Sequence, residues 1–217
     1  MRALLVRHGE SVSNADPKVS LPDELGDRLT DRGLEQADAL GRSLTESGIT
    51  DLIASPMGRA RQTAEAIGAH IGLEPEIDPE IHELRESPGF GELDSEEQML
   101  RRWSAWMPAS DPDHSEHGGE SFNEVLGRVR GFKARLEERR DERKPLVVSH
   151  GIFLRFFLID SVLGDDFAPA MAPQLWNLRT TNCGVSVFEH GERYHAADPK
   201  RPGWVCASWM ERPWARP

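Results

Sequence analysis

The sequence has few cysteines and no apolar stretch long enough to cross a bilayer. Only Cys183 and Cys206 occur in 217 residues, so no disulfide framework is predicted, and both thiols are expected to be small buried side chains in a reducing compartment. Residues 3–6 are too short for the apolar core of a secretory signal. Arg155 and Asp160 interrupt the most apolar later stretch, residues 152–163, which excludes a membrane span there. We therefore expect a cytoplasmic protein with no membrane partner.

Positive charge is also scarce. The chain has 26 Lys and Arg residues against 37 Asp and Glu residues, which gives a formal net charge of −11. Proteins that bind nucleic acids depend on clustered basic side chains, so nucleic acid is not an expected partner. A length of 217 residues with 38% hydrophobic residues is typical of one folded domain, which we expect to span residues 1–217.

Short apolar runs alternate with helical patterns along the chain. Three runs have the character of strands buried on both faces: residues 3–6, 51–54 and 146–148. Four segments repeat apolar residues at helical spacing: residues 30–46, 56–72, 121–144 and from 152 onward. This order favours an α/β fold, with an open, mostly parallel sheet and helices on both of its faces.

The end of the chain and one internal segment have a different character. Residues 86–120 are rich in Pro, Gly, acidic residues and His, and we predict that they form an inserted, partly helical lid. Late strands are predicted at 185–188 and 194–196. The tail from 198 to 217 shows no clear period, and we expect it to wrap the surface, with Trp204, Trp209 and Trp214 as packing anchors.

Cationic residues follow all three predicted strands. Arg7-His8-Gly9 follows the first, a segment containing Arg59 follows the second, and Ser149-His150-Gly151 follows the third. Ligands of such sheets bind beyond the carboxyl ends of the strands, so two histidines and two arginines should converge there. Guanidinium groups bind phosphate oxygens in pairs, and imidazole can act as a nucleophile near neutral pH. The pattern predicts phosphoryl chemistry without a metal or other cofactor, since two guanidinium groups would repel a divalent cation.

Several motifs in chain order resemble those of the histidine phosphatase superfamily, the phosphoglycerate-mutase-like group. They are Arg7-His8-Gly9-Glu10-Ser11 with Asn14, Leu29-Thr30-x-x-Gly33-x-x-Gln36-Ala37, Ser55-Pro56-x-x-Arg59-Ala60-x-Gln62-Thr63-Ala64, Gly119-Glu120-Ser121 with Arg128-Val129, and Val147-Val148-Ser149-His150-Gly151. The sequence departs from the family pattern at Gly89-Phe90-Gly91-Glu92-Leu93 and is longer than usual between residues 15 and 27.

The resemblance implies a role for each matching residue. His8 would attack phosphorus as a neutral imidazole and become a transient phosphohistidine. Arg7, Arg59, His150 and Asn14 would hold the phosphoryl oxygens, with His150 able to act as a cation. A carboxylic acid would protonate the leaving oxygen; Glu83 fits this role better than Glu86, which follows a similar short pattern.

Three functions remain open at this point. The first is a metal-independent phosphatase acting on a small phosphate monoester. The second is a phosphoglycerate-mutase-type phosphotransferase, although the longer segment that the family's mutases usually carry after the acidic residue is missing. The third is a catalytically weak phosphate-ligand-binding regulatory module, which would have no need of a nucleophile. The physiological substrate is left open by the sequence, and so is assembly into a homo-oligomer.

Overall fold

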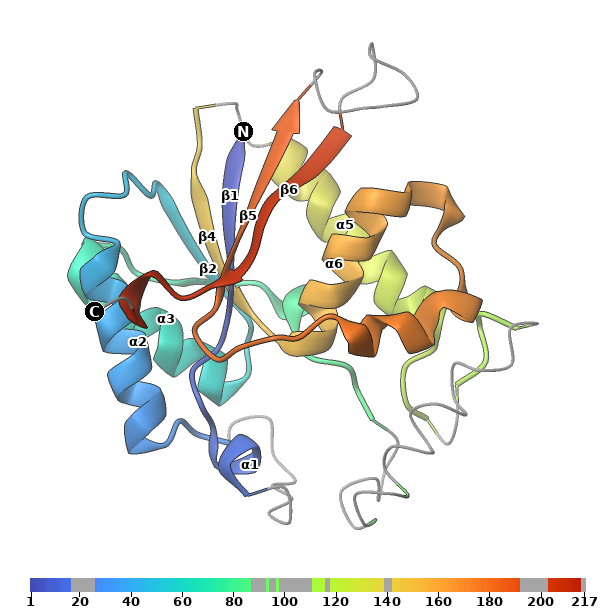
Figure 1. The fold of residues 1–217 in the computed structure, drawn as a ribbon, viewed down its shortest axis with the longest axis horizontal. Helices are drawn as coiled ribbons and strands as arrows, with labels where there is room; N and C mark the ends of the chain where they lie inside the picture. Colours follow the sequence, from blue (N-terminus) through green and yellow to red (C-terminus); the bar gives the residue numbers. More distant parts are fainter. Residues whose placement is uncertain are drawn as a thin grey trace.

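The protein forms one mixed sheet with helices on both faces (Figure 1). The computed structural model describes residues 1–16, 26–86, 93, 97, 111–115, 118–138, 142–191 and 203–215. The strands are β1 (Arg2–Arg7), β2 (Asp51–Ala54), β3 (Glu76–Ile77), β4 (Pro145–Ser149), β5 (Val185–Gly191) and β6 (Gly203–Glu211). The helices are α1 (Val12–Ala15), α2 (Asp31–Ser43), α3 (Gly58–Ile71), α5 (Phe122–Glu138) and α6 (Gly151–Leu163). Short 3-10 helices are η1 (Pro79–Ile81), η3 (Gly164–Asp166), η4 (Pro169–Asn177) and η6 (Pro213–Ala215).

The strand order of the sheet is β3-β2-β4-β1-β5-β6. The first four strands in that order pair in parallel, and the register between β1 and β4 aligns Leu4 with Leu146 and Arg7 with Ser149. β5 runs antiparallel to β1, and β6 antiparallel to β5. The predicted α/β fold with a mostly parallel sheet is confirmed. The carboxyl ends of β1, β2 and β4 consequently meet at one edge.

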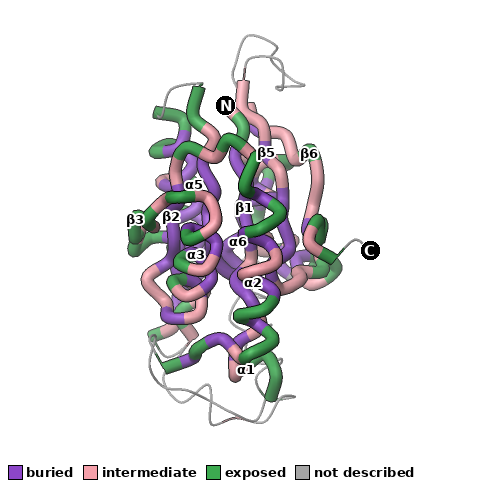
Figure 2. The backbone as a smooth tube through the Cα atoms, turned by 90° about the vertical axis from the view of Figure 1, so that its left-hand side faces the viewer, coloured by how far each residue is buried: buried purple, intermediate pink, exposed green. Residues whose placement is uncertain are grey.

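Two apolar cores lie on opposite faces of the sheet. In Figure 1, α2 and α3 lie to the left of the strands and α5 and α6 to the right. Leu40 of α2 and Ile67 of α3 belong to one core, while Phe132 of α5 and Phe153 of α6 belong to the other. Figure 2 shows the buried backbone concentrated in the strands and the inner sides of the helices. Both faces of β1 and β4 are therefore covered, which explains their uninterrupted apolar sequence.

The helix ends follow local capping chemistry. The Thr30 hydroxyl accepts a hydrogen bond from the Gly33 N–H at 3.0 Å, as an N-cap side chain does. Ser121 and Glu124 form the predicted capping box, with bonds of 3.1 and 2.7 Å. α3 starts at Gly58, two residues later than predicted, and its last residue, Ile71, is followed by the C-cap Gly72, whose φ of 73° is left-handed.

Several predictions differ from the structure or lie largely outside the described residues. The prediction that residues 203–211 belong to a surface-wrapping tail is wrong. They form edge strand β6, and shifts in its register against β5 break the alternation of side chains along the strand. Leu34 belongs to the apolar repeat from which the helix at residues 30–46 was predicted, but it is 42% exposed, and the neighbouring Gly33 is the buried residue. The predicted lid is described only at 86, 93, 97, 111–115 and 118–120, and the predicted strand at 194–196 lies outside the described residues. Across the described residues, no helix is long and apolar enough to span a membrane.

Candidate active site

His8 stands directly after β1, at the edge where the parallel strands end. Its side chain is buried, and its ring nitrogens have two distinct partners. Nδ1 lies 2.7 Å from the Gly9 carbonyl oxygen, which can only accept a hydrogen bond, so Nδ1 carries the proton. Arg59 Nε, which can only donate, lies 3.1 Å from Nε2. His8 is therefore a neutral imidazole with the lone pair of Nε2 facing Arg59.

The surroundings of His8 also favour the neutral form. Burial lowers the pKa of His8 well below its usual value, and the positive charges of Arg59 and Arg7 lower it further. A neutral imidazole is the form that can act as a nucleophile. The tautomer of His8, the burial of its ring and the positive charges beside it therefore all favour an unprotonated Nε2 at the edge of the sheet.

His150 caps the start of α6 beside His8. The two ring centroids are 5.1 Å apart, and Nε2 of His150 lies 2.7 Å from the Ser55 hydroxyl. Nδ1 of His150 is buried and has no hydrogen-bond partner among the described residues. The expectation that His150 could act as a cation is not supported in this state, since burial and the charge of Arg59 lower its pKa well below the usual value.

Arg7 and Asn14 form the side of the site nearest β5. Arg7 donates from Nη1 to the Thr180 carbonyl at 3.1 Å and from Nη2 to Asn14 Oδ1 at 3.3 Å. Its buried Nε has no partner among the described residues. The Asn182 amide donates to Asn14 Oδ1 at 2.9 Å and to the His8 carbonyl at 3.0 Å. The segment from Thr180 to Asn182, which the sequence analysis did not identify, thus holds Arg7 and Asn14 in place.

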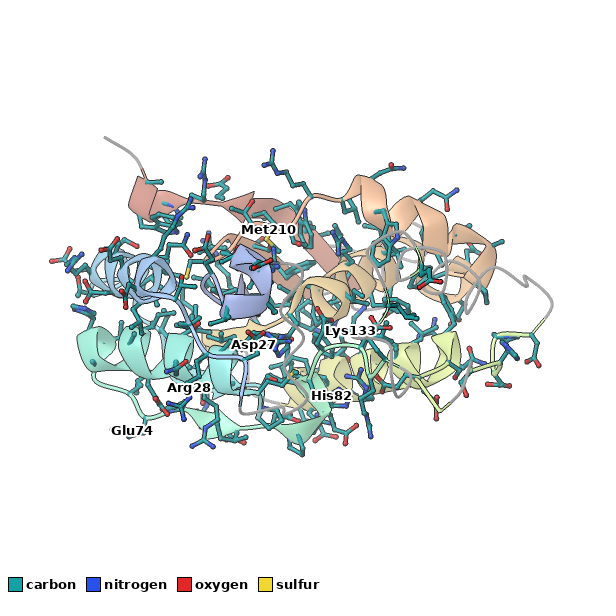
Figure 3. All side chains as sticks on the ribbon, turned by 90° about the horizontal axis from the view of Figure 1, so that it is seen from below. Asp27, Arg28, Glu74, His82, Lys133 and Met210 are labelled. Carbon is teal, nitrogen blue, oxygen red and sulfur yellow. The ribbon has the colours of Figure 1, made fainter. Side chains whose placement is uncertain are left out.

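Arg59 links His8 to Asp27, a residue that no sequence motif had indicated. Asp27 Oδ2 lies 2.9 Å from Arg59 Nη1, and both side chains are largely buried. Figure 3 looks onto the edge at which the parallel strands end, with Asp27 near the middle of the view. Asp27 lies two positions before the motif residues Leu29 and Thr30, but neither the motif as quoted nor the apolar pattern included it.

Glu83 lies at the start of α6, next to His150. Its carboxylate oxygens accept hydrogen bonds from the Ile152 N–H at 3.1 and 3.3 Å and from the Leu84 N–H at 3.0 Å. Burial lowers the pKa of Arg7, and the negative charge of Glu83 opposes this shift. The carboxylate of Glu83 is consequently part of the same charged site as the two arginines.

A buried ion pair supports the segment that carries Glu83. Arg128 donates to both oxygens of Glu120, at 2.7 and 2.9 Å, and to the His82 carbonyl at 3.2 Å. Glu120 also accepts from the Arg85 N–H at 2.8 Å. Figure 3 labels His82 within this region. The Glu120 and Arg128 motif positions thus fix the backbone on both sides of Glu83.

Close backbone contacts support the His8 side of the site. A Cβ on Gly33 would lie 2.0 Å from the Glu10 carbonyl oxygen, and one on Gly9 would lie 2.6 Å from the Gly33 carbonyl oxygen. Gln36 accepts from the Glu10 N–H at 2.9 Å, and Thr63 accepts from the Gly9 N–H at 3.0 Å. These motif residues therefore orient the backbone around His8.

Candidate metal ligands are sparse in the part of the chain that the structure describes. No group of three or more His, Cys, Asp or Glu side chains there is arranged to hold a metal ion. Burial raises the pKa of Cys183 to about 12, so this thiol beside Arg7 is not an activated nucleophile.

Comparisons with known proteins match nearly the whole chain. The family model of the histidine phosphatase superfamily (branch 1) matches residues 3–198. The "Probable phosphoglycerate mutase GpmB" of Erwinia tasmaniensis is 31% identical over 218 residues, covering 97% of this chain and 90% of that protein. The alpha-ribazole phosphatase of Shigella flexneri has a TM-score of 0.73 at 26% identity, with 98% and 97% of the two chains covered. Phosphoserine phosphatase of Entamoeba histolytica shares the fold, with a TM-score of 0.73 at 18% identity and 99% of each chain covered. On the evidence of the site and of these matches, the chain belongs to the histidine phosphatase superfamily.

Proposed function

We propose that this protein is a metal-independent phosphatase that hydrolyses small phosphate monoesters through a phosphohistidine at His8. The observation that carries the proposal is the fixed tautomer of His8, with Nδ1 bound to the Gly9 carbonyl and Nε2 facing Arg59. An imidazole held in this way has its nucleophilic lone pair directed to the place where two guanidinium groups can hold a phosphoryl group.

In the first step, His8 Nε2 attacks phosphorus and the bond from phosphorus to the leaving oxygen breaks. Arg7, Arg59 and His150 stabilise the charge on the equatorial oxygens, which is where most of the catalysis of phosphoryl transfer arises. Two buried polar atoms of this site, Arg7 Nε and His150 Nδ1, have no partner among the described residues, which supports that role.

Glu83 acts as the acid and then as the base. As a carboxylic acid it protonates the leaving oxygen, which departs as an alcohol. The resulting carboxylate takes a proton from water, whose oxygen attacks the phosphohistidine and releases inorganic phosphate. The original proton on Glu83 and the imidazole of His8 are restored. The contact of the Glu83 carboxylate with the Ile152 N–H in the first turn of α6 supports this choice over Glu86.

A generic aryl phosphate assayed in EDTA tests the reaction. We expect turnover to be kept in EDTA and His8→Ala to reduce it by about 10⁴-fold or more, as deletion of a catalytic nucleophile does. Acid-labile labelling of His8 during turnover is the direct readout of the intermediate. Turnover by His8→Ala at the rate of the unaltered protein would contradict the mechanism.

The general acid is tested by a matched pair of substitutions. Glu83→Gln should reduce turnover by about 10²–10⁴-fold, the usual contribution of general acid–base catalysis, whereas Glu86→Gln should leave it nearly unchanged. Substrates with a good leaving group, which needs no protonation, should lose less. The reverse ranking of the two variants would assign the acid to Glu86.

A phosphotransferase is the second candidate, because a curated relative with 31% identity carries the name of a phosphoglycerate mutase. Such an enzyme would pass the phosphoryl group from His8 to a second hydroxyl of the substrate. Supplying 3-phosphoglycerate with catalytic 2,3-bisphosphoglycerate separates the two reactions. We expect release of inorganic phosphate to exceed formation of 2-phosphoglycerate; the opposite ratio would favour the mutase.

A further inference from the structure

The carboxylate of Asp27 has an environment unlike that of an ordinary surface aspartate. Its side chain is only 5% exposed, and three groups donate to it. The Ser13 N–H donates to Oδ1 at 3.0 Å, the Ser13 hydroxyl donates to Oδ2 at 2.6 Å, and Arg59 Nη1 donates to Oδ2 at 2.9 Å. Both oxygens of Asp27 are thus fixed, and one of them binds a residue that contacts the imidazole of His8.

The geometry of Arg59 explains why its bond to Asp27 affects the contact with His8. Its Nε donates to His8 Nε2 at 3.1 Å while its Nη1 points the other way, to Asp27. A guanidinium group is planar, so fixing Nη1 also fixes the direction of Nε. Arg59 has rotatable bonds along its side chain, and without Asp27 several rotamers would compete for that direction.

Charge gives a second reason. Arg59 lies beside the guanidinium of Arg7, and each of the two cations lowers the pKa of His8. A buried cation without a partner is unfavourable, so Arg59 would tend to turn toward water if the carboxylate were lost. Asp27 therefore holds Arg59 inward in the absence of a phosphate group.

We infer that Asp27 is a positioning residue for phosphoryl transfer: it holds the Arg59 guanidinium in the orientation that aligns Nε with the attacking nitrogen of His8. This inference rests on the proposed function for its catalytic consequence. Asp27 acts through Arg59 and not through contact with the phosphoryl group. Its effect should therefore vanish when Arg59 is absent.

A double-mutant cycle tests this dependence. Asp27→Asn keeps the shape of the side chain and removes its charge, and it should lower kcat/KM for the aryl phosphate by about 10–10²-fold, the scale of a misplaced catalytic group. In an Arg59→Ala background, Asp27→Asn should cause no further loss. Asp27→Glu, which keeps the carboxylate, should recover part of the activity. Asp38→Asn is the control, since Asp38 pairs with His70 on the α2 and α3 surface, and its activity should be unchanged.

Orthovanadate binding, followed by thermal stabilisation, is measured on the same proteins because it does not require turnover. We expect Asp27→Asn to weaken vanadate binding in the presence of Arg59 and to have no effect in Arg59→Ala. If the unaltered protein binds vanadate with this coupling but hydrolyses nothing, the proposed function fails and the role of Asp27 stands. Additive losses in the double variant, or an Asp27→Asn protein equal to the unaltered one in both assays, would overturn the inference. If Asp27→Asn does not fold, the comparison of Asp27→Glu with and without Arg59 takes its place, under the same criteria.

Discussion

Two clusters of charged and titratable side chains are centred on buried residues, and they differ in how their polar atoms are paired. The interhelical cluster consists of Lys133, Arg130 and Asp160, between α5 and α6. Asp160 accepts from Lys133 Nζ at 2.7 Å and from Arg130 Nε at 2.8 Å, and Lys133 also lies 5.4 Å from the Phe157 ring centroid. Figure 3 shows Lys133 in the region between these two helices. Each oxygen of this aspartate has a cationic partner, as expected of a cluster that serves stability.

The crevice cluster consists of Arg7, His8, Arg59 and His150, and its polar groups are not all matched. Arg7 Nε and His150 Nδ1 are buried and have no hydrogen-bond partner among the described residues. Buried unsatisfied donors are rare in folded proteins and call for a reason. Buried charge alone therefore does not mark a functional site, whereas buried polar atoms without a partner, beside the fixed imidazole of His8, favour the proposed one.

The largest expected effect tests the interhelical cluster. Asp160→Asn should lower the free energy of unfolding by about 3–5 kcal/mol, because it leaves the buried Lys133 ammonium without its charged partner. The kcat of the folded fraction should not change. Urea unfolding and turnover on the same samples measure both quantities.

A compensated variant gives the control for that experiment. Lys133→Met combined with Asp160→Leu replaces the buried pair with apolar side chains and should be less destabilised than Asp160→Asn alone. Equal destabilisation of the two proteins would show that the unpaired charge of Lys133 is not the cause of the lower free energy of unfolding.

The second largest expected effect concerns the crevice cluster, where we expect a loss of turnover in place of a large loss of stability. His150→Ala should lower kcat by about 10²–10³-fold, the cost of losing one transition-state donor. It should destabilise the protein less than Asp160→Asn, because Nδ1 of the ring has no hydrogen-bond partner among the described residues and the loss is limited to the neutral contact of Nε2 with the Ser55 hydroxyl. Steady-state kinetics and urea unfolding check the two parts. A stability loss larger than that of Asp160→Asn without a change in kcat would reverse the contrast between the clusters.

The pH dependence of stability provides a third test. The pKa values of His8 and His150 are well below 6.5 in the folded protein, chiefly because the rings are buried. Unfolded histidines take up protons as the pH falls below about 6.5 while the folded ones do not, so stability is retained above that pH and lost below it. The slope should approach about 1.4 kcal/mol per pH unit for each histidine. Urea unfolding at several pH values should show a shallower slope for His8→Asn.

The smallest effect concerns the backbone that supports the crevice cluster. Gly33→Ala places a Cβ against the Glu10 carbonyl and should cost about 1–3 kcal/mol, the usual range for overpacking. Gly127→Ala is the matched control, since a Cβ there meets nothing within 4 Å, and it should stabilise α5 by about 0.5–1 kcal/mol. Thermal or urea unfolding of both variants measures the difference, and equal effects would argue against the close contact.

The sequence was sufficient to predict the parallel strands β1, β2 and β4 and the helices that follow them, because continuous apolar runs and capping residues are local signals; the two-residue parallel strand β3 was too short to give such a signal. Leu146, Thr30 and Gly72 all lie where such signals indicated. The meeting of Arg7, His8, Arg59 and His150 was also predictable, since the carboxyl ends of parallel strands share one edge. β6 was not, because its register shifts break the alternation that identifies a strand.

Residues that act by long-range pairing were beyond local patterns. Asp27 contacts Arg59 across 32 positions, and Asn182 contacts the His8 carbonyl across 174. Neither sits in an apolar period or at a strand end that would have marked it. Glu120 and Arg128 were identified only as motif positions, and their bidentate pair beneath the Glu83 segment became visible only in three dimensions.

The pairing of β1 with β4 has a consequence for how the protein is made. Leu4 lies opposite Leu146 in the sheet, and the Arg7 guanidinium is held by Thr180, so the surroundings of His8 come from most of the chain. During synthesis, the first strand leaves the ribosome long before its neighbours in the sheet exist. Such non-local pairing slows folding and leaves apolar strands exposed to wrong partners in the meantime. A nascent chain that stops before β4 should therefore need a chaperone and bind no phosphate, which couples the appearance of the proposed activity to the synthesis of β4 and the residues after it.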